Sequence, residues 1–144
     1  MDYSEPMLAE ARKRFAADKN VKVIRHDLSD PLPSELGKFD AVVSSLAIHH
    51  CTHARKRRLY QEIYDLLNPK GVFCNLEHVA SPTEALHVKF MNLIGQPPET
   101  EDKSNKLLDV ETQLRWLRKI GFTDVDCHWK WLEVALLFGV KPPL

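Results

Sequence analysis

Residues 39–50 read FDAVVSSLAIHH, and this stretch decides the fold class. Its first nine residues are nearly all apolar or small, which predicts a strand buried on both faces of a sheet. Shorter apolar runs flank it, Val21–Ile24 upstream and GVFCNL at 71–76 downstream. Between the second and third runs, leucine and isoleucine recur at helical spacing over 53–67. Strands that alternate with helices predict a parallel sheet.

Further helices are expected at residues 5–15, 80–94 and 109–120. Residues 124–131 alternate in polarity, and the apolar run 134–140 follows so closely that the two strands must pair antiparallel. The alternation should place four residues on one side of the strand: Val125, Cys127, Trp129 and Trp131. We therefore expect one α/β domain over residues 1–144. Its core would be a Rossmann-like, mostly parallel sheet with helices on both faces and an antiparallel C-terminal strand pair.

The composition excludes several classes of protein. The 144 residues carry 20 Lys and Arg against 20 Asp and Glu, so the basic excess of a general nucleic-acid binder is missing. No apolar run approaches the roughly 20 residues that span a bilayer, so we expect no membrane association. The three cysteines are odd in number and widely spaced, which argues against a disulfide framework and favours a cytoplasmic location.

Candidate functional residues follow from the expected sheet. In parallel α/β sheets, ligands bind beyond the carboxyl ends of the strands. The polar residues at the expected strand exits are Asp2, Asp27, residues 44–50 and residues 77–78.

Five segments, in this order and spacing, resemble the class I S-adenosylmethionine-dependent methyltransferases. They are DYSEPMLAEARKRF, HDLSDPLP, FDAVVSSLAIHH, RLYQEIYDLLNPKGVF and the closing GFTDVDCHWKW…LLFGVKP. The likeness extends over essentially the whole chain. The resemblance implies S-adenosylmethionine as cofactor and methyl transfer to an oxygen, nitrogen or carbon atom of a small-molecule acceptor.

The resemblance also implies roles for individual residues. Asp2 would hydrogen-bond the ribose hydroxyls, and Asp27 would accept from the adenine amino group. His49 or His50 would be a general base or a substrate contact, because imidazole titrates near working pH. The cofactor-binding residues implied by the family are Asp2, Tyr3, Met7, Asp27, Leu28, Ser44, Ser45 and Leu46.

One family feature is missing from the sequence. The glycine-rich loop after the first strand has no counterpart, because the glycines of this chain are far apart. Asp2 stands where the family's second strand ends, so we expect the first strand and its loop to be absent and the domain to be N-terminally truncated. Residues 80–108 are expected to form a substrate or lid segment.

Other interpretations of the same residues are open. His49 and His53 have the spacing of two metal ligands on a helix, but no CxxC or HExxH accompanies them, so we expect no metal. Residues 55–58 (RKRR) would form a solvated first helical turn. Cys51 has neighbouring histidines but no third group to orient a nucleophile. The alternative function is a non-catalytic interaction protein that forms a homodimer or completes a partner's sheet.

Overall fold

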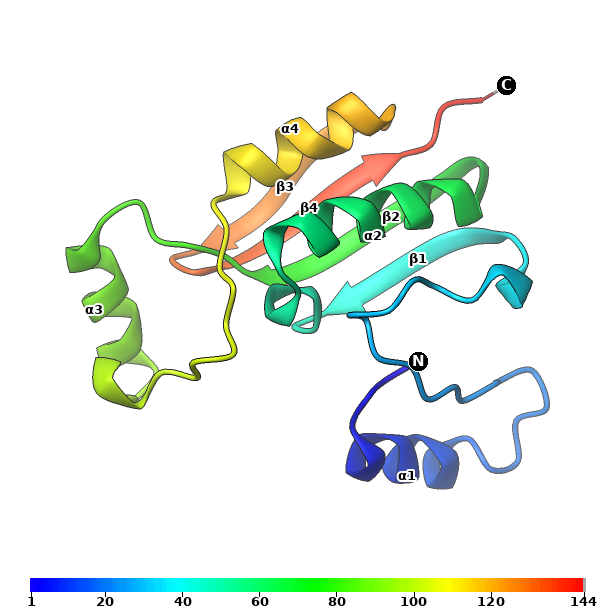
Figure 1. The fold of residues 1–144 in the computed structure, drawn as a ribbon, viewed down its shortest axis with the longest axis horizontal. Coiled ribbons are helices and arrows are strands. Elements are labelled where there is room, and N and C mark those ends of the chain that lie inside the picture. The colour runs from blue at the N-terminus through cyan, green and yellow to red at the C-terminus, as the bar shows by residue number, and fades with distance from the viewer. Residues whose placement is uncertain (144) are drawn as a thin grey trace.

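The computed structural model describes residues 1–143, and its centre is a four-stranded mixed sheet in the order β1-β2-β4-β3 (Figure 1). The strands are β1 (Phe39–Ser45), β2 (Leu67–His78), β3 (Thr123–Trp131) and β4 (Val134–Val140). Only β1 and β2 pair in parallel, while β4 pairs antiparallel with both β2 and β3. The α/β class is confirmed, but the expectation of a mostly parallel sheet is wrong. Val21–Ile24 forms no strand, and an isolated bridge between Asp2 and Arg25 is found beside it instead.

Four α-helices accompany the sheet: α1 (Glu5–Arg14), α2 (His53–Leu66), α3 (Glu84–Leu93) and α4 (Val110–Ile120). Short 3-10 turns lie at Ser34–Leu36 (η1), Ile48–His50 (η2) and Pro98–Thr100 (η3). Side-chain oxygens of Thr52, Thr83 and Asp109 accept backbone N–H bonds and cap α2, α3 and α4. Gly121 ends α4 in the left-handed region (φ 120°), as its position in the sequence predicts.

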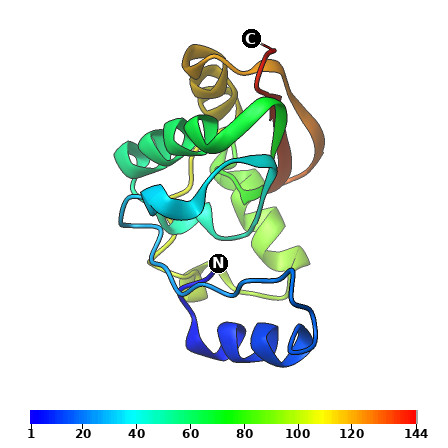
Figure 2. The same cartoon turned by 90° about the vertical axis from the view of Figure 1, so that its right-hand side faces the viewer.

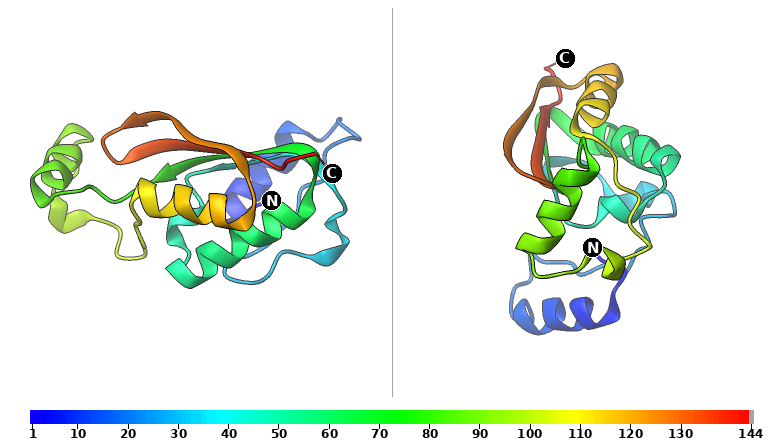
Figure 3. Two further views of the ribbon diagram at one scale, coloured as in Figure 1. Left: turned by 90° about the horizontal axis from the view of Figure 1, so that it is seen from above. Right: turned by 90° about the vertical axis from the view of Figure 1, so that its left-hand side faces the viewer.

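The helices α2 and α4 lie on the same face of the sheet (Figure 3). Alternate residues of β2 and β4 are fully buried beneath them, with Phe73 and Leu137 in the shared core. The expectation of helices on both faces is wrong for this sheet. The expectation that residues 39–47 form a strand buried on both faces is also wrong, because β1 is an edge strand and its Val43 is 73% exposed.

Irregular pairing in β3 changes the direction of its side chains. The register with β4 shifts between Cys127 and Trp129. Val125 and Cys127 pack against the core, whereas Trp129 and Trp131 are 51% and 41% exposed. The four residues therefore do not share one side of the strand, because a bulge reverses the alternation partway along it.

The remaining segments extend from the edges of the sheet. The helix α1 lies beyond the β1 edge, and α3 lies past the end of β2 (Figures 1 and 2). From η3 the chain returns to α4 across the carboxyl ends of β1 and β2 (Figure 1). Within residues 1–143, none of the helices combines the length and the apolar character that crossing a bilayer requires.

Candidate functional site

The chain turns sharply after β1, next to β2. Leu46 has a left-handed backbone (φ 48°), which costs a non-glycine residue about 1–2 kcal/mol. Its N–H donates to the carbonyl of Leu76 at 2.8 Å, so the turn is tied to the neighbouring strand. The turn leads into η2, which buries Ile48 and His49.

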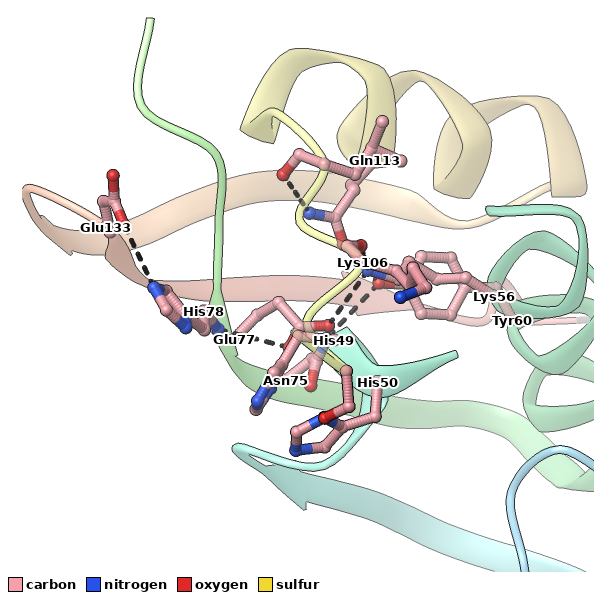
Figure 4. Close-up of polar contacts among 12 residues, drawn as sticks. His49, His50, Lys56, Tyr60, Asn75, Glu77, His78, Lys106, Gln113 and Glu133 are labelled. Atoms are coloured by element: carbon pink, nitrogen blue, oxygen red, sulfur yellow. Dashed lines mark hydrogen bonds and ion pairs between the residues drawn. The ribbon is translucent and has the colours of Figure 1, made fainter. Parts of the chain in front are cut away.

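The central pair of the site is His49 and Glu77. His49 is 7% exposed, and Glu77, next to the last residue of β2, is fully buried. Nδ1 of His49 lies 3.3 Å from Oε1 of Glu77 (Figure 4). This is ion-pair distance, but among the described residues Nδ1 has no hydrogen-bond partner of good geometry. A carboxylate beside Nδ1 favours a proton on that nitrogen and leaves Nε2 as the acceptor.

Three fully buried polar side chains, Asn75, Tyr60 and Gln113, form a chain of hydrogen bonds that begins at Glu77 (Figure 4). Nδ2 of Asn75 donates to Oε2 of Glu77 and to the Tyr60 hydroxyl, both at 3.2 Å. Tyr60 in turn donates to Oε1 of Gln113 at 2.6 Å. Burial raises the pKa of Tyr60 well above its usual value, so its hydroxyl remains a donor. These bonds join β2, α2 and α4 beneath the site.

Lys56 is also fully buried. Its Nζ lies 4.0 Å from Oε2 of Glu77 and donates to the carbonyl of Lys106 at 3.2 Å. The expectation of a solvated basic turn at 55–58 is therefore wrong for its first two residues, because the first turn of α2 packs against neighbouring chain segments instead of facing solvent.

Arg55, the other buried cation of this turn, holds the loop that follows Asp27. Its guanidinium donates to both carboxylate oxygens of Glu62, at 2.6 and 2.8 Å. It also donates to the carbonyls of Leu28 and Asp30, each at 2.8 Å. Such a bidentate contact fixes the geometry of the group more firmly than a lysine would.

A second histidine–carboxylate cluster adjoins the first. The ring of His78 lies 5.5 Å from that of His49 between centroids, and its Nε2 is 3.0 Å from Oε2 of the fully buried Glu133. The other oxygen of Glu133 lies 2.9 Å from Nδ1 of His87, on α3. The hydrogen bond to Glu133 raises the pKa of His87. Burial would raise the pKa of Glu133, but hydrogen bonds from Ser81 and the two histidines outweigh it and lower that pKa.

Residues 101–109, which we call the strap, cross the site on the way to α4. The N–H of Lys106 donates to the carbonyl of His49 at 2.8 Å, and Nε2 of His53 lies 3.0 Å from the carbonyl of Leu107. Oγ of Ser104 lies 2.9 Å from Nδ1 of His50. His50 is exposed, and partial burial of its ring together with neighbouring His49 lowers its pKa. The strap thus holds both histidines of η2.

Asp2 and Asp27 lie on neighbouring extended segments. The parallel bridge joins Asp2 to Arg25, and the N–H of His26 donates to the carbonyl of Asp2 at 2.9 Å. Each carboxylate is exposed and accepts one local N–H bond, from Ser4 at 2.7 Å and from Ser29 at 2.8 Å respectively. The bonds from Ser29 lower the pKa of Asp27, which keeps it an anionic acceptor.

These two carboxylates fit the hydroxyl and amino groups of an adenosine, which are hydrogen-bond donors. The methionine end of the cofactor has no matching backbone cradle in the part of the chain described, since its glycines are widely separated.

The other residues implied by the resemblance lie in two places. Tyr3 and Met7 follow Asp2 in the sequence and are more than half exposed. Ser44 and Ser45 end β1, and Leu46 begins the turn that follows it. Leu28 packs against the core, and Arg55 ties its carbonyl to the start of α2.

Two alternative chemistries have no support from side-chain placement. Across residues 1–143, no three His, Cys, Asp or Glu side chains gather in a group that could hold a metal ion. Cys51 is buried, and burial raises the pKa of its thiol, which disfavours the thiolate that a nucleophile requires.

Comparison with known proteins agrees with this architecture. Residues 1–71 match the model of a methyltransferase domain. The chain is 30% identical over 158 residues to the demethylmenaquinone methyltransferase of Clavibacter sepedonicus, covering 98% of this chain and 63% of that protein. It is 32% identical over 127 residues to the non-reducing polyketide synthase esdpA of Penicillium shearii, covering 87% of this chain and 6% of that one. The chain thus spans less than two-thirds of each of these relatives.

Solved structures share the fold. An O-methyltransferase family protein from Burkholderia thailandensis superposes with a TM-score of 0.74 at 20% identity, over 99% of this chain and 42% of that one. Human N-acetylserotonin methyltransferase, solved in complex with SAM, gives 0.64 at 16% identity, over 98% and 40%. The matched model, the relatives and the shared fold agree with one another: residues 1–71 match a methyltransferase domain, and the chain has the fold of the class I S-adenosylmethionine-dependent methyltransferases.

Proposed function

We propose that this domain takes part in methyl transfer from S-adenosylmethionine to a small molecule with a weakly acidic O–H or C–H group, and that His49 is the general base. The observation that carries the proposal is the buried pair of His49 and Glu77 at the carboxyl ends of β1 and β2. This is the edge of an α/β sheet at which ligands bind.

In this pair, His49 would be the base and Glu77 the group that orients its imidazole. With the Nδ1 proton facing Glu77, Nε2 of His49 has a lone pair that accepts the acceptor's proton. The imidazole then becomes an imidazolium, and the adjacent carboxylate stabilises the new positive charge. The acceptor's freed electron pair would then be available to the methyl carbon, whose bond to the cofactor's sulfur would break and leave a neutral thioether. Such a base is needed when the nucleophile is a hydroxyl or an activated carbon that retains its proton.

The cofactor's adenosine end would be held by Asp2 and Asp27, whose exposed carboxylates lie on adjoining segments. When bound, S-adenosylmethionine supplies the methyl group on a positively charged sulfur. Arg55 would support this side indirectly, because it fixes the loop after Asp27.

The acceptor class follows from the base and agrees with the names of relatives. A demethylmenaquinone methyltransferase and a polyketide synthase are among them, and both names refer to carbonyl- and hydroxyl-bearing carbon skeletons. Oxygens of this type acidify neighbouring O–H and C–H bonds, which matches proton removal by an imidazole.

Radiolabelled methyl transfer tests the proposal in this chain and in a version extended upstream to the length of the relatives. A panel of phenols and 1,3-dicarbonyl compounds would serve as acceptors. His49→Asn should lower kcat by about 100- to 10,000-fold, the usual contribution of a general base. His128→Asn, an exposed residue on β3, is the matched control and should leave kcat unchanged. Full activity in His49→Asn would exclude His49 as the base.

The second candidate is a non-catalytic protein that pairs with a second copy of itself. The open β1 edge favours it, because an unpaired apolar edge strand recruits further strands.

A further inference from the structure

The fully buried ammonium of Lys56 has no role in the reaction described above. Lys56 lies on the first turn of α2, and its Nζ reaches Glu77 from one side and the strap from the other (Figure 4). Burying an ammonium costs several kcal/mol unless charge and hydrogen bonds compensate. At this buried helix position, a lysine is therefore less favourable for folding than a leucine or a methionine would be.

Lys56 is the cation that faces the Glu77 carboxylate within the buried network. Oε2 of Glu77 receives a hydrogen bond from Asn75, and Oε1 receives one from the N–H of His78. Both of these donors are neutral. Burial lowers the pKa of the Lys56 ammonium, and the negative charge of Glu77 opposes that shift. Besides His49, the other titratable groups near this pair are the thiol of Cys51, the hydroxyl of Tyr60 and the ring of His50.

We propose that Lys56 is a positioning residue for His49 and acts through Glu77. The inference rests on the proposed role of His49 as the base. With the ammonium present, Glu77 is a carboxylate, and its negative charge beside Nδ1 of His49 favours a proton on that nitrogen. Without it, a fully buried carboxyl group that has only neutral donors takes up a proton. A protonated Glu77 no longer favours the Nδ1–H tautomer, and Nε2 then loses its lone pair in part of the molecules.

The hydrogen bond to the strap adds a second effect. Nζ of Lys56 holds the carbonyl of Lys106, and the N–H of the same residue holds the carbonyl of His49. One ammonium thus fixes both the carboxylate behind the imidazole and the backbone beneath it. Lys56→Gln separates the two effects, because an amide keeps a donor for the carbonyl and removes the charge.

The test is nitrogen-15 NMR of the His49 ring in the 144-residue chain, which needs no cofactor and no acceptor. The chain itself and Arg57→Gln, an exposed neighbouring cation, should show one protonated and one unprotonated ring nitrogen. Lys56→Met and Lys56→Gln should both show a mixture of tautomers, and isotope-edited infrared spectra should show a protonated Glu77. Unchanged tautomers and an ionised Glu77 in both Lys56 variants would overturn the proposal.

Stability provides the second measurement and covers the case in which Lys56→Met folds poorly. Removing one partner of a buried ion pair is costly, whereas removing both is often tolerated. The Lys56→Met/Glu77→Gln double variant should therefore be more stable than Lys56→Met alone. Additive losses would mean that Lys56 does not act through Glu77, and would overturn the proposal. If His49→Asn retains full transfer activity, the proposed function fails, while the dependence of the tautomer on Lys56 remains measurable in the same chain.

Discussion

The buried carboxylate of Glu133 lies 2.9 Å from Nδ1 of His87, and this contact joins α3 to the turn between β3 and β4. His87 also approaches Glu101, at 3.4 Å from its Nε2. A single imidazole thus holds α3, the turn after β3 and the start of the strap. Because its pKa is raised, the strength of this junction depends on pH.

The attachment of α3 should weaken as pH rises. A histidine whose pKa is raised on folding contributes its full stability below its ordinary value of 6.5 and loses it as pH passes through the raised value. Glu133 has the opposite sign: its lowered pKa means that its contribution is lost only in acid. Hydrogen-exchange protection factors of α3 should therefore be highest in mildly acidic solution and fall above neutrality.

His87→Gln should remove this pH dependence and lower α3 protection by on the order of 1–3 kcal/mol, the range for a charge-assisted hydrogen bond. His128→Gln, on β3, should behave like the unmodified chain. A pH dependence of α3 that persists in His87→Gln would assign it to another group.

Cofactor affinity should depend on both carboxylates of the N-terminal segment. Asp27→Ala and Asp2→Ala should each weaken S-adenosylmethionine binding by about 1–3 kcal/mol, since each leaves a donor of the ligand unpaired. Asp18→Ala is a matched control, because Asp18 also accepts a hydrogen bond from the N–H two residues on, that of Asn20. Calorimetric titration of the upstream-extended protein measures all three. Unchanged affinity in both test variants would remove the cofactor-site assignment.

The open edge of β1 should cause association in solution. Val43 combines high exposure with a place on an edge strand, so we expect the 144-residue chain to self-associate. Val43→Lys should shift the mass measured by light scattering toward the monomer, because lysine blocks edge pairing. Val21→Lys, the control, changes an exposed valine outside the sheet and should leave the measured mass unchanged. A monomer at high concentration in the unmodified chain would contradict this prediction.

Gly121 should be intolerant of a side chain. An alanine there would adopt an unfavourable φ of 120°, and its Cβ would come within 3.1 Å of the Tyr64 hydroxyl. We expect Gly121→Ala to cost more than about 1 kcal/mol of unfolding free energy in a denaturant titration. Gly95→Ala also has a positive φ (73°), but it has open space around the new Cβ. Gly121→Ala should therefore lose more stability than Gly95→Ala, because it combines a less favourable φ with the contact to Tyr64, and equal losses would contradict this prediction.

The sequence predicted the elements well where the pattern was long and regular. The helix α2, the strand β4 and the stop at Gly121 follow from periodicity and capping that need no tertiary information. The strand expected at Val21–Ile24 is absent, because a short run with three β-branched residues forms a strand only when a neighbouring strand offers its backbone for pairing. The bulge at Cys127 could not be predicted for a similar reason. Alternation of polarity along one strand does not show where its register with the neighbouring strand shifts.

The site was only partly readable. The sequence singles out His49, Asp2 and Asp27 as candidates, because they stand at expected strand exits or match a family motif. The buried polar residues beside them were missed, although the sequence pattern indicates their burial. Lys56 shares helical spacing with Leu59 and Ile63, and Asn75 lies two residues after Phe73, on the same face of the strand. Polar residues at core positions of an amphipathic pattern indicate a buried network, but which residues pair is decided only when separate elements meet.

Arg55 and Lys56 are consecutive in the first turn of α2, but they contact different parts of the site. Arg55 holds the loop that carries Asp27, and Lys56 faces the carboxylate beside His49. A small rotation or shift of this one helix would move the adenosine side and the proton-accepting side together, and would preserve the spacing between them. Anyone who redesigns this domain for a new acceptor should therefore treat residues 52–56 as a fixed frame, and should vary the strap and α3 instead.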